Sequence, residues 1–185
     1  MASGLCGKSK DMIWLRKQGF RVLGVELSDI AVQAFYKENG YVPKHIVDGK
    51  FDRYEADDIR ILCGDFFDLS KDDLSNVSAV YDRAALIALP HELRIRYARH
   101  LVSILPPATQ VLLITVDYPQ MEMQGPPFSV SSGETKTLFT GHAKALLLTQ
   151  MDVLAQNPRF QQRGLSRLRE NITVSCHNAT SLVQT

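Results

Sequence analysis

Residues 20–26 read Phe20-Arg21-Val22-Leu23-Gly24-Val25-Glu26, a short apolar run that closes on an acid. A helical pattern from Ser9 to Gln18 precedes this run, and a second one from Ser28 to Gly40 follows it. The serine that begins each helix can accept a backbone N–H as a cap, and Gly19 supplies the left-handed residue that ends the first helix. Helix, strand and helix in this order predict an α/β domain with a mostly parallel sheet.

The rest of the chain continues this alternation. Further strands are predicted at residues 59–63, 77–81, 111–116, 143–149 and 171–176, a hairpin around Asp48-Gly49, and helices at 90–105 and 133–139. We therefore expect a single domain over residues 1–176 and a disordered tail over 177–185, where the sequence is polar.

Composition and charge narrow the class of protein. The 185-residue chain is 45% hydrophobic and 22% charged, as is typical of a soluble globular domain. Its 21 Lys and Arg against 20 Asp and Glu leave a formal charge of +1, so no charge excess indicates nucleic acid or a membrane as partner. Three cysteines without CxxC spacing argue against a disulfide framework and against a metal site. With no secretion signal or membrane segment, the sequence predicts a cytoplasmic protein with a small-molecule ligand.

Polar residues gather where the predicted strands end, which is where ligands bind in such sheets. Glu26 closes its strand and could accept both hydroxyls of a ribose, because an ionised carboxylate has two acceptor oxygens. Asp65 could accept a hydrogen bond from an adenine amino group while the ring of Phe66 packs on the base. Each acid also fits a simple turn or helix cap.

Five blocks of sequence carry a specific resemblance. They are Leu5-Cys6-Gly7-Lys8-Ser9-Lys10-Asp11-Met12, Gly24-Val25-Glu26-Leu27-Ser28, Cys63-Gly64-Asp65-Phe66-Phe67, the run from Tyr81-Asp82-Arg83 to Leu89-Pro90, and Gly125-Pro126-Pro127-Phe128. In this order, from Leu5 to about Val174, the chain resembles the thiopurine S-methyltransferase family. The resemblance implies a Rossmann-like methyltransferase sheet, S-adenosylmethionine as cofactor, and a small aromatic or heterocyclic thiol as methyl acceptor. We expect a monomer if the chain is fully folded.

The resemblance also implies a role for each matching residue. Leu5, Cys6 and Gly7 would face the methionine part of the cofactor, Glu26 the ribose, Asp65 and Phe66 the adenine, Arg83 both cofactor and acceptor, and Pro127 and Phe128 the acceptor.

Two residues are candidates for the chemistry itself. Arg83 stays protonated, so it can favour the anionic form of a thiol but cannot be a base. Asp82 could accept a proton, or could equally be a hydrogen-bond acceptor at the strand end.

Other charged residues have two interpretations each. Lys8 could contact the cofactor carboxylate or be a solvated lysine. The cluster Arg94, Arg96 and Arg99 is interpreted as a solvated helix face rather than as an RNA site. The basic stretch formed by Arg159, Arg163, Arg167 and Arg169 could contact an anionic acceptor or be a solvated surface.

The chain departs from the family at its start. Family members carry a longer segment ahead of the Leu5 block, whereas here only Met1-Ala2-Ser3-Gly4 precedes it, and none of these four is a good strand former. We therefore expect the first central strand to be missing, with the edges at residues 22–25 and 78–81 either closed onto each other or separated by a gap. The loop at residues 5–7 would be distorted and the chain marginally folded. The alternative function is then a truncated, catalytically weak relative with at most a binding role.

Overall fold

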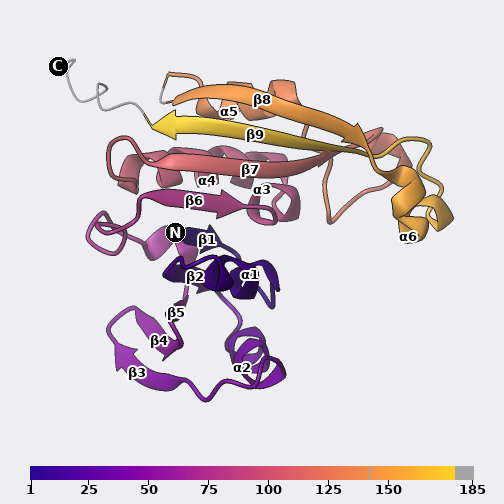
Figure 1. The fold of residues 1–185 in the computed structure, drawn as a ribbon. Coiled ribbons are helices and arrows are strands. Elements are labelled where there is room, and N and C mark those ends of the chain that lie inside the picture. Colours follow the sequence, from indigo (N-terminus) through magenta and orange to yellow (C-terminus); the bar gives the residue numbers. More distant parts are fainter. Residues whose placement is uncertain (142, 178–185) are drawn as a thin grey trace. The chain divides into compact units, whose positions relative to one another are not determined.

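The computed structural model describes residues 1–141 and 143–177, and the chain forms two compact units, one spanning Met1–Tyr81 and the other beginning at Asp82. Figure 1 shows the elements of each unit. The tail expected at residues 177–185 lies, from residue 178 on, outside the described residues.

The first unit is an α/β sheet whose inner strands are parallel. Its strands are β1 (Ala2–Gly4), β2 (Val22–Glu26), β3 (Lys44–Asp48), β4 (Phe51–Ala56), β5 (Ile59–Cys63) and β6 (Ala79–Asp82), and its helices are α1 (Asp11–Lys17), α2 (Asp29–Glu38) and the 3₁₀ turn η1 (Phe66–Asp68). The order is β3-β4-β5-β2-β1-β6, with β5, β2, β1 and β6 parallel and the hairpin β3-β4 antiparallel on β5. Because parallel strands end at the same edge of a sheet, the loops after β1, β2 and β5 meet there.

The expectation of a missing central strand is wrong. Ala2–Gly4 is paired in parallel with β2 at three positions, and Ala2 also pairs with Val80 of β6. The ladder extends beyond the strand, because Leu23 N–H donates to Met1 O at 2.8 Å and Cys6 N–H donates to Val25 O at 3.0 Å. A segment with a neighbour on each side gains backbone hydrogen bonds that outweigh poor β-propensity, and small side chains fit this buried place.

The core of the first unit explains its helices. Met12 and Leu15 of α1 and Val32, Phe35 and Tyr36 of α2 are buried against the sheet. Ser28 caps α2 as predicted, since its hydroxyl accepts the Ala31 N–H at 3.3 Å. These contacts fix the two helices that flank the end of β2.

The second unit has an antiparallel sheet. Its strands, in the order β7-β9-β8, are β7 (Gln110–Asp117), β9 (Arg169–His177) and β8 (Ala143–Asp152), which carries a bulge near Leu147. Its helices are α3 (Ala85–Ala88), α4 (His91–Ile104), α5 (Ser132–Phe139) and α6 (Pro158–Gln162), with 3₁₀ turns η2 (Gln120–Glu122) and η3 (Leu154–Gln156). Within the described residues, none of the helices is long and apolar enough to cross a membrane.

Candidate functional site

The loop after β1 rests directly on β2. Its backbone takes positive φ at Leu5 (46°) and Gly7 (50°), and Ser9 N–H donates to Cys6 O at 3.0 Å to close the turn. A Cβ on Gly24 would lie 2.8 Å from Cys6 Sγ, so only glycine at this position of β2 lets the loop pack this closely. Burial raises the pKa of the Cys6 thiol to about 12, which makes it a packing residue rather than a nucleophile.

Glu26 is brought to this loop. Its Oε2 accepts the Gly7 N–H at 2.8 Å and its Oε1 accepts the Ser28 N–H at 2.9 Å. The two bonds fix the plane of the carboxylate, and each oxygen keeps a second acceptor site. A rigid pair of acceptors at the end of β2 fits a vicinal diol such as the ribose of S-adenosylmethionine.

Asp65 lies beside Glu26, because Gly64 N–H donates to the Glu26 carbonyl at 3.0 Å. One carboxylate oxygen of Asp65 accepts the Phe67 N–H at 2.9 Å and caps η1, while the side chain stays exposed. The ring of Phe66 is 5% exposed and meets the half-buried Phe67 edge to face. A base at this place would therefore meet little of the Phe66 ring, and its contact with adenine stays a prediction.

Lys8 has a protein partner. Its Nζ lies 2.7 Å from Glu38 Oε1 in an exposed ion pair between the loop and the end of α2. This arrangement agrees with the interpretation of Lys8 as a surface residue.

Asp82 is the last residue of β6 and the first residue of the second unit, and it is 2% exposed. Its Oδ1 accepts the Ala85 N–H and its Oδ2 accepts the Tyr97 hydroxyl, both at 2.9 Å. Burial raises the pKa of this carboxyl to about 6, while the Tyr97 hydroxyl and the backbone N–H groups of residues 84–86 oppose the rise. These contacts favour the interpretation of Asp82 as a hydrogen-bond acceptor at the strand end, one that anchors the turn from which the exposed Arg83 projects.

The segment of Pro127 and Phe128 is held by its backbone. Tyr118 hydroxyl donates to Pro127 O, and Phe128 N–H donates to Ile87 O of α3, both at 2.6 Å. A Cβ on Gly125 would lie 2.5 Å from the Phe128 ring, so the ring packs against the glycine backbone. Both side chains remain half-buried and thus accessible from one side.

The expectation for Arg94 is wrong, because it is only 4% exposed. Its Nε donates to Leu89 O at 2.8 Å, and its guanidinium also contacts Ser129 O and pairs with Glu134 of α5. The sequence held a signal for this, since Arg94 lies three and seven residues before the buried Tyr97 and Leu101. Leu93 lies four residues before Tyr97, a spacing that predicts a place on the apolar face, but it is 39% exposed.

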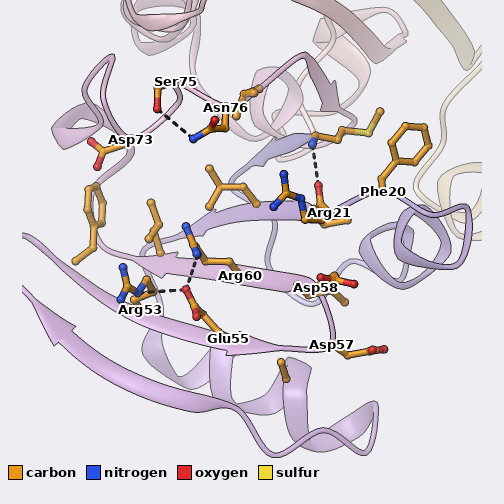
Figure 2. A pocket seen from close by; sticks show the side chains of 18 of the residues that line it. Phe20, Arg21, Arg53, Glu55, Asp57, Asp58, Arg60, Asp73, Ser75 and Asn76 are labelled. Carbon is orange, nitrogen blue, oxygen red and sulfur yellow. Dashed lines mark hydrogen bonds and ion pairs between the residues drawn. The ribbon is translucent and has the colours of Figure 1, made fainter.

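The first unit also has a wide hollow, which is separate from the loop at Gly7 and from Glu26. Figure 2 shows it over the strands β4 and β5, where Glu55 bridges Arg53 and Arg60. Its lining contains neither Gly7 nor Glu26, and it carries acidic and basic side chains in equal number.

The described residues lack the features of a metal site and of a disulfide. Residues 1–141 and 143–177 contain no cluster of His, Cys, Asp and Glu suited to a metal ion. Cys6, Cys63 and Cys176 are free thiols.

Comparison with known proteins identifies relatives over most of the chain. The sequence profile of the family described as Thiopurine S-methyltransferase matches residues 4–178. The Thiopurine S-methyltransferase of Nitrosospira multiformis is 62% identical over 168 residues, covering 91% of this chain and 76% of that protein. The corresponding protein of Pseudomonas fluorescens strain Pf0-1 is 48% identical, with 91% and 77% covered.

Solved structures resemble the fold. A SAM-dependent methyltransferase from Anabaena variabilis has a TM-score of 0.62 at 15% identity, covering 96% of this chain and 76% of that one. Phosphoethanolamine N-methyltransferase 2 of Haemonchus contortus, solved with S-adenosylhomocysteine, has a TM-score of 0.64 at 11% identity, covering 96% and 49%. These likenesses confirm the Rossmann-like methyltransferase fold that the sequence predicts.

Proposed function

This chain belongs to the thiopurine S-methyltransferase family, and we propose that it transfers a methyl group to the sulfur of a small aromatic or heterocyclic thiol of the thiopurine type. It is a methyltransferase, and its cofactor is S-adenosylmethionine. When bound, this cofactor would supply a methyl group attached to a sulfonium. The neutral thioether that this sulfonium becomes is a good leaving group and would need no acid to leave. The work left to the protein is positioning.

The Glu26 carboxylate is the observation that carries the proposal. Two backbone N–H groups hold it at the carboxyl end of β2 and leave acceptor capacity for a ribose. Leu5, Cys6 and Gly7 form the adjoining loop that would bind the methionine part, and Asp65 and Phe66 follow the neighbouring strand for the adenine.

The acceptor side belongs to the second unit. Arg83 is exposed at a turn that the buried Asp82 anchors, so its permanent charge can favour the thiolate form of the acceptor. Pro127 and Phe128 offer an apolar wall for a planar ring. Asp82 would act by holding this turn, since its acceptor sites face Tyr97 and backbone N–H groups.

We further propose that the protein is a cytoplasmic monomer that acts on a small molecule. The free thiols fit a reducing compartment, and the formal charge of +1 offers no attraction to nucleic acid or a lipid surface.

Calorimetric titration with S-adenosylmethionine, followed by a methylation assay with 6-mercaptopurine, tests the proposal. Micromolar cofactor binding together with S-methylated product is the expected result. Cofactor binding with turnover only of a non-aromatic thiol would overturn the acceptor class. No cofactor binding by folded protein would favour the alternative of a catalytically weak relative.

A further inference from the structure

We propose that Arg94 is a positioning residue that fixes the acceptor wall at Phe128. The inference rests on the proposed function, since it takes Phe128 as part of the acceptor site. Arg94 lies behind the wall and acts through Phe128 and Ser129.

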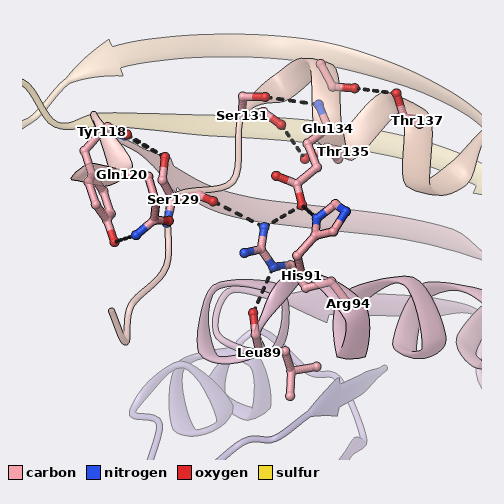
Figure 3. Close-up of polar contacts among 11 residues, drawn as sticks. Leu89, His91, Arg94, Tyr118, Gln120, Ser129, Ser131, Glu134, Thr135 and Thr137 are labelled. Atoms are coloured by element: carbon pink, nitrogen blue, oxygen red, sulfur yellow. Dashed lines mark hydrogen bonds and ion pairs between the residues drawn. The ribbon is translucent and has the colours of Figure 1, made fainter. Parts of the chain in front are cut away.

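One guanidinium joins three segments of the second unit, as Figure 3 shows. Nε donates to Leu89 O, just beyond α3, at 2.8 Å, and a terminal nitrogen donates to Ser129 O at 3.2 Å. The same nitrogen pairs with Glu134 Oε1 of α5, 40 residues away in the sequence. The centre of the guanidinium lies 5.9 Å from the Phe128 ring centroid, within range of a cation–π contact.

The chemistry of the Arg94 guanidinium suits a residue that holds its partners in place better than one that only fills space in the core. A charge buried to this degree is costly, and an apolar side chain would pack α4 at lower cost. The planar guanidinium carries donors on separate nitrogens, so one nitrogen reaches Leu89 O while another reaches Ser129 O and Glu134. The donors of a lysine all lie on one nitrogen and do not span that separation. The net gain of retaining Arg94 is therefore a fixed arrangement of its partners.

That arrangement includes the residues assigned to the acceptor. Phe128 is held by its N–H on Ile87 O, by the contact of its ring with Gly125 and by the Arg94 guanidinium near the ring. Arg94 also holds Leu89, at the end of the short helix that follows Arg83. It thus sets the Phe128 wall relative to α3, and a shift of about 1 Å between such groups can cost 100-fold in rate.

The experiment compares Arg94→Lys and Arg94→Met with Arg99→Met, a matched control on the exposed side of the same helix. We expect both Arg94 variants to raise the KM for 6-mercaptopurine by about 10-fold or more, and Arg99→Met to change it less than twofold. The dissociation constant for S-adenosylmethionine should change less than twofold in all three. Equal losses of cofactor and acceptor binding, or an unchanged acceptor KM, would overturn the proposal.

Glu134→Gln and Phe128→Leu sharpen the test. Glu134→Gln keeps a hydrogen-bond acceptor and should reproduce the KM effect more weakly. If Arg94 acts through Phe128, the double variant that combines an Arg94 substitution with Phe128→Leu should raise the KM for 6-mercaptopurine by less than the product of the two single effects. Additive losses would contradict this route.

Hydrogen exchange supplies a readout that does not need activity. In Arg94→Lys the Phe128 amide, bonded to Ile87 O in the native chain, should exchange at least 10-fold faster while amides of β7 keep their protection. Unchanged exchange at the Phe128 amide would overturn the proposal for Arg94, whether or not the wild-type chain methylates a thiopurine. A wild-type chain that methylates no thiopurine would overturn only the proposed function.

Discussion

The two units hold the charged groups of the candidate site in opposite ways. In the first, Glu26 and Asp65 are not fully buried, and backbone N–H groups hold them: those of Gly7 and Ser28 hold Glu26, and that of Phe67 holds Asp65. In the second, Asp82 and Arg94 are almost wholly buried, and side chains 15 and 40 residues away hold them. Accessible carboxylates held by backbone N–H groups keep acceptor sites for a ligand, whereas the buried groups fix the surface around a ligand.

The largest effect should follow from removing the accessible acid. Glu26→Ala deletes both acceptors for the ribose and should weaken S-adenosylmethionine binding by about 2 to 4 kcal/mol, measured by calorimetry. Glu26→Gln keeps one carbonyl oxygen and should fall between wild type and Glu26→Ala. If neither variant changes the Kd for S-adenosylmethionine, Glu26 does not bind the cofactor, and the proposed difference between the two units is wrong.

A smaller loss should come from crowding the loop that binds Glu26. Gly24→Ala places a Cβ 2.8 Å from Cys6 Sγ, and we expect the free energy of unfolding to fall by about 1 to 3 kcal/mol. Cys6→Ala removes the sulfur and should recover part of this loss in the double variant. Urea unfolding of the four proteins checks it, and simple additivity would show that the contact is absent.

The same contrast explains what the sequence could reveal. The strand at Ile59–Cys63, the hairpin at Asp48-Gly49 and the acid at the end of β2 follow from local patterns, because alternation, turn chemistry and chain direction decide them. The contact between Glu26 and Gly7 did not follow from these patterns, because it requires β1 beside β2, whereas the sequence predicts that strand to be missing.

The features that escaped depend on distant partners. Ala2–Gly4 lacks β-propensity and becomes a strand only because neighbours lie on both sides. Arg94 is hydrophilic, so its polarity alone predicts that its side chain is exposed to solvent. Its burial requires Glu134, Ser129 and Leu89 together, and no local pattern joins those positions.

Asp82 permits a test with a milder outcome. Its ordinary pKa is 3.8, and burial raises it to about 6 in the folded chain, so the folded state retains a proton that the unfolded state loses first. The contribution of this group to stability is full below pH 3.8 and is lost as pH rises through 6. Asp82→Asn, which does not titrate, should flatten that fall in urea unfolding between pH 4 and 7.

Turnover of the same variant separates the two roles of Asp82. Asparagine can still accept the Ala85 N–H, so a turn anchor should survive the change with most of its activity at neutral pH. A drop of about 100-fold or more with an unchanged melting temperature would identify Asp82 as a general base. Asp82 would then act directly on a ligand, as proposed for Glu26, rather than by positioning other groups, as proposed for Arg94.

The smallest effect is expected at the exposed ion pair of Lys8 and Glu38, at the outer rim of the first unit. The side chains are 49% and 56% exposed, and such pairs contribute about 0.5 kcal/mol or less. Lys8→Ala and Glu38→Ala should therefore leave stability almost unchanged, and neither should alter the Kd for S-adenosylmethionine more than twofold in 0.15 M salt. The pair itself predicts equal behaviour of the two variants. If Lys8→Ala weakened cofactor binding tenfold while Glu38→Ala strengthened it, Lys8 would leave Glu38 for the cofactor carboxylate, and Glu38 would compete with that carboxylate for the lysine.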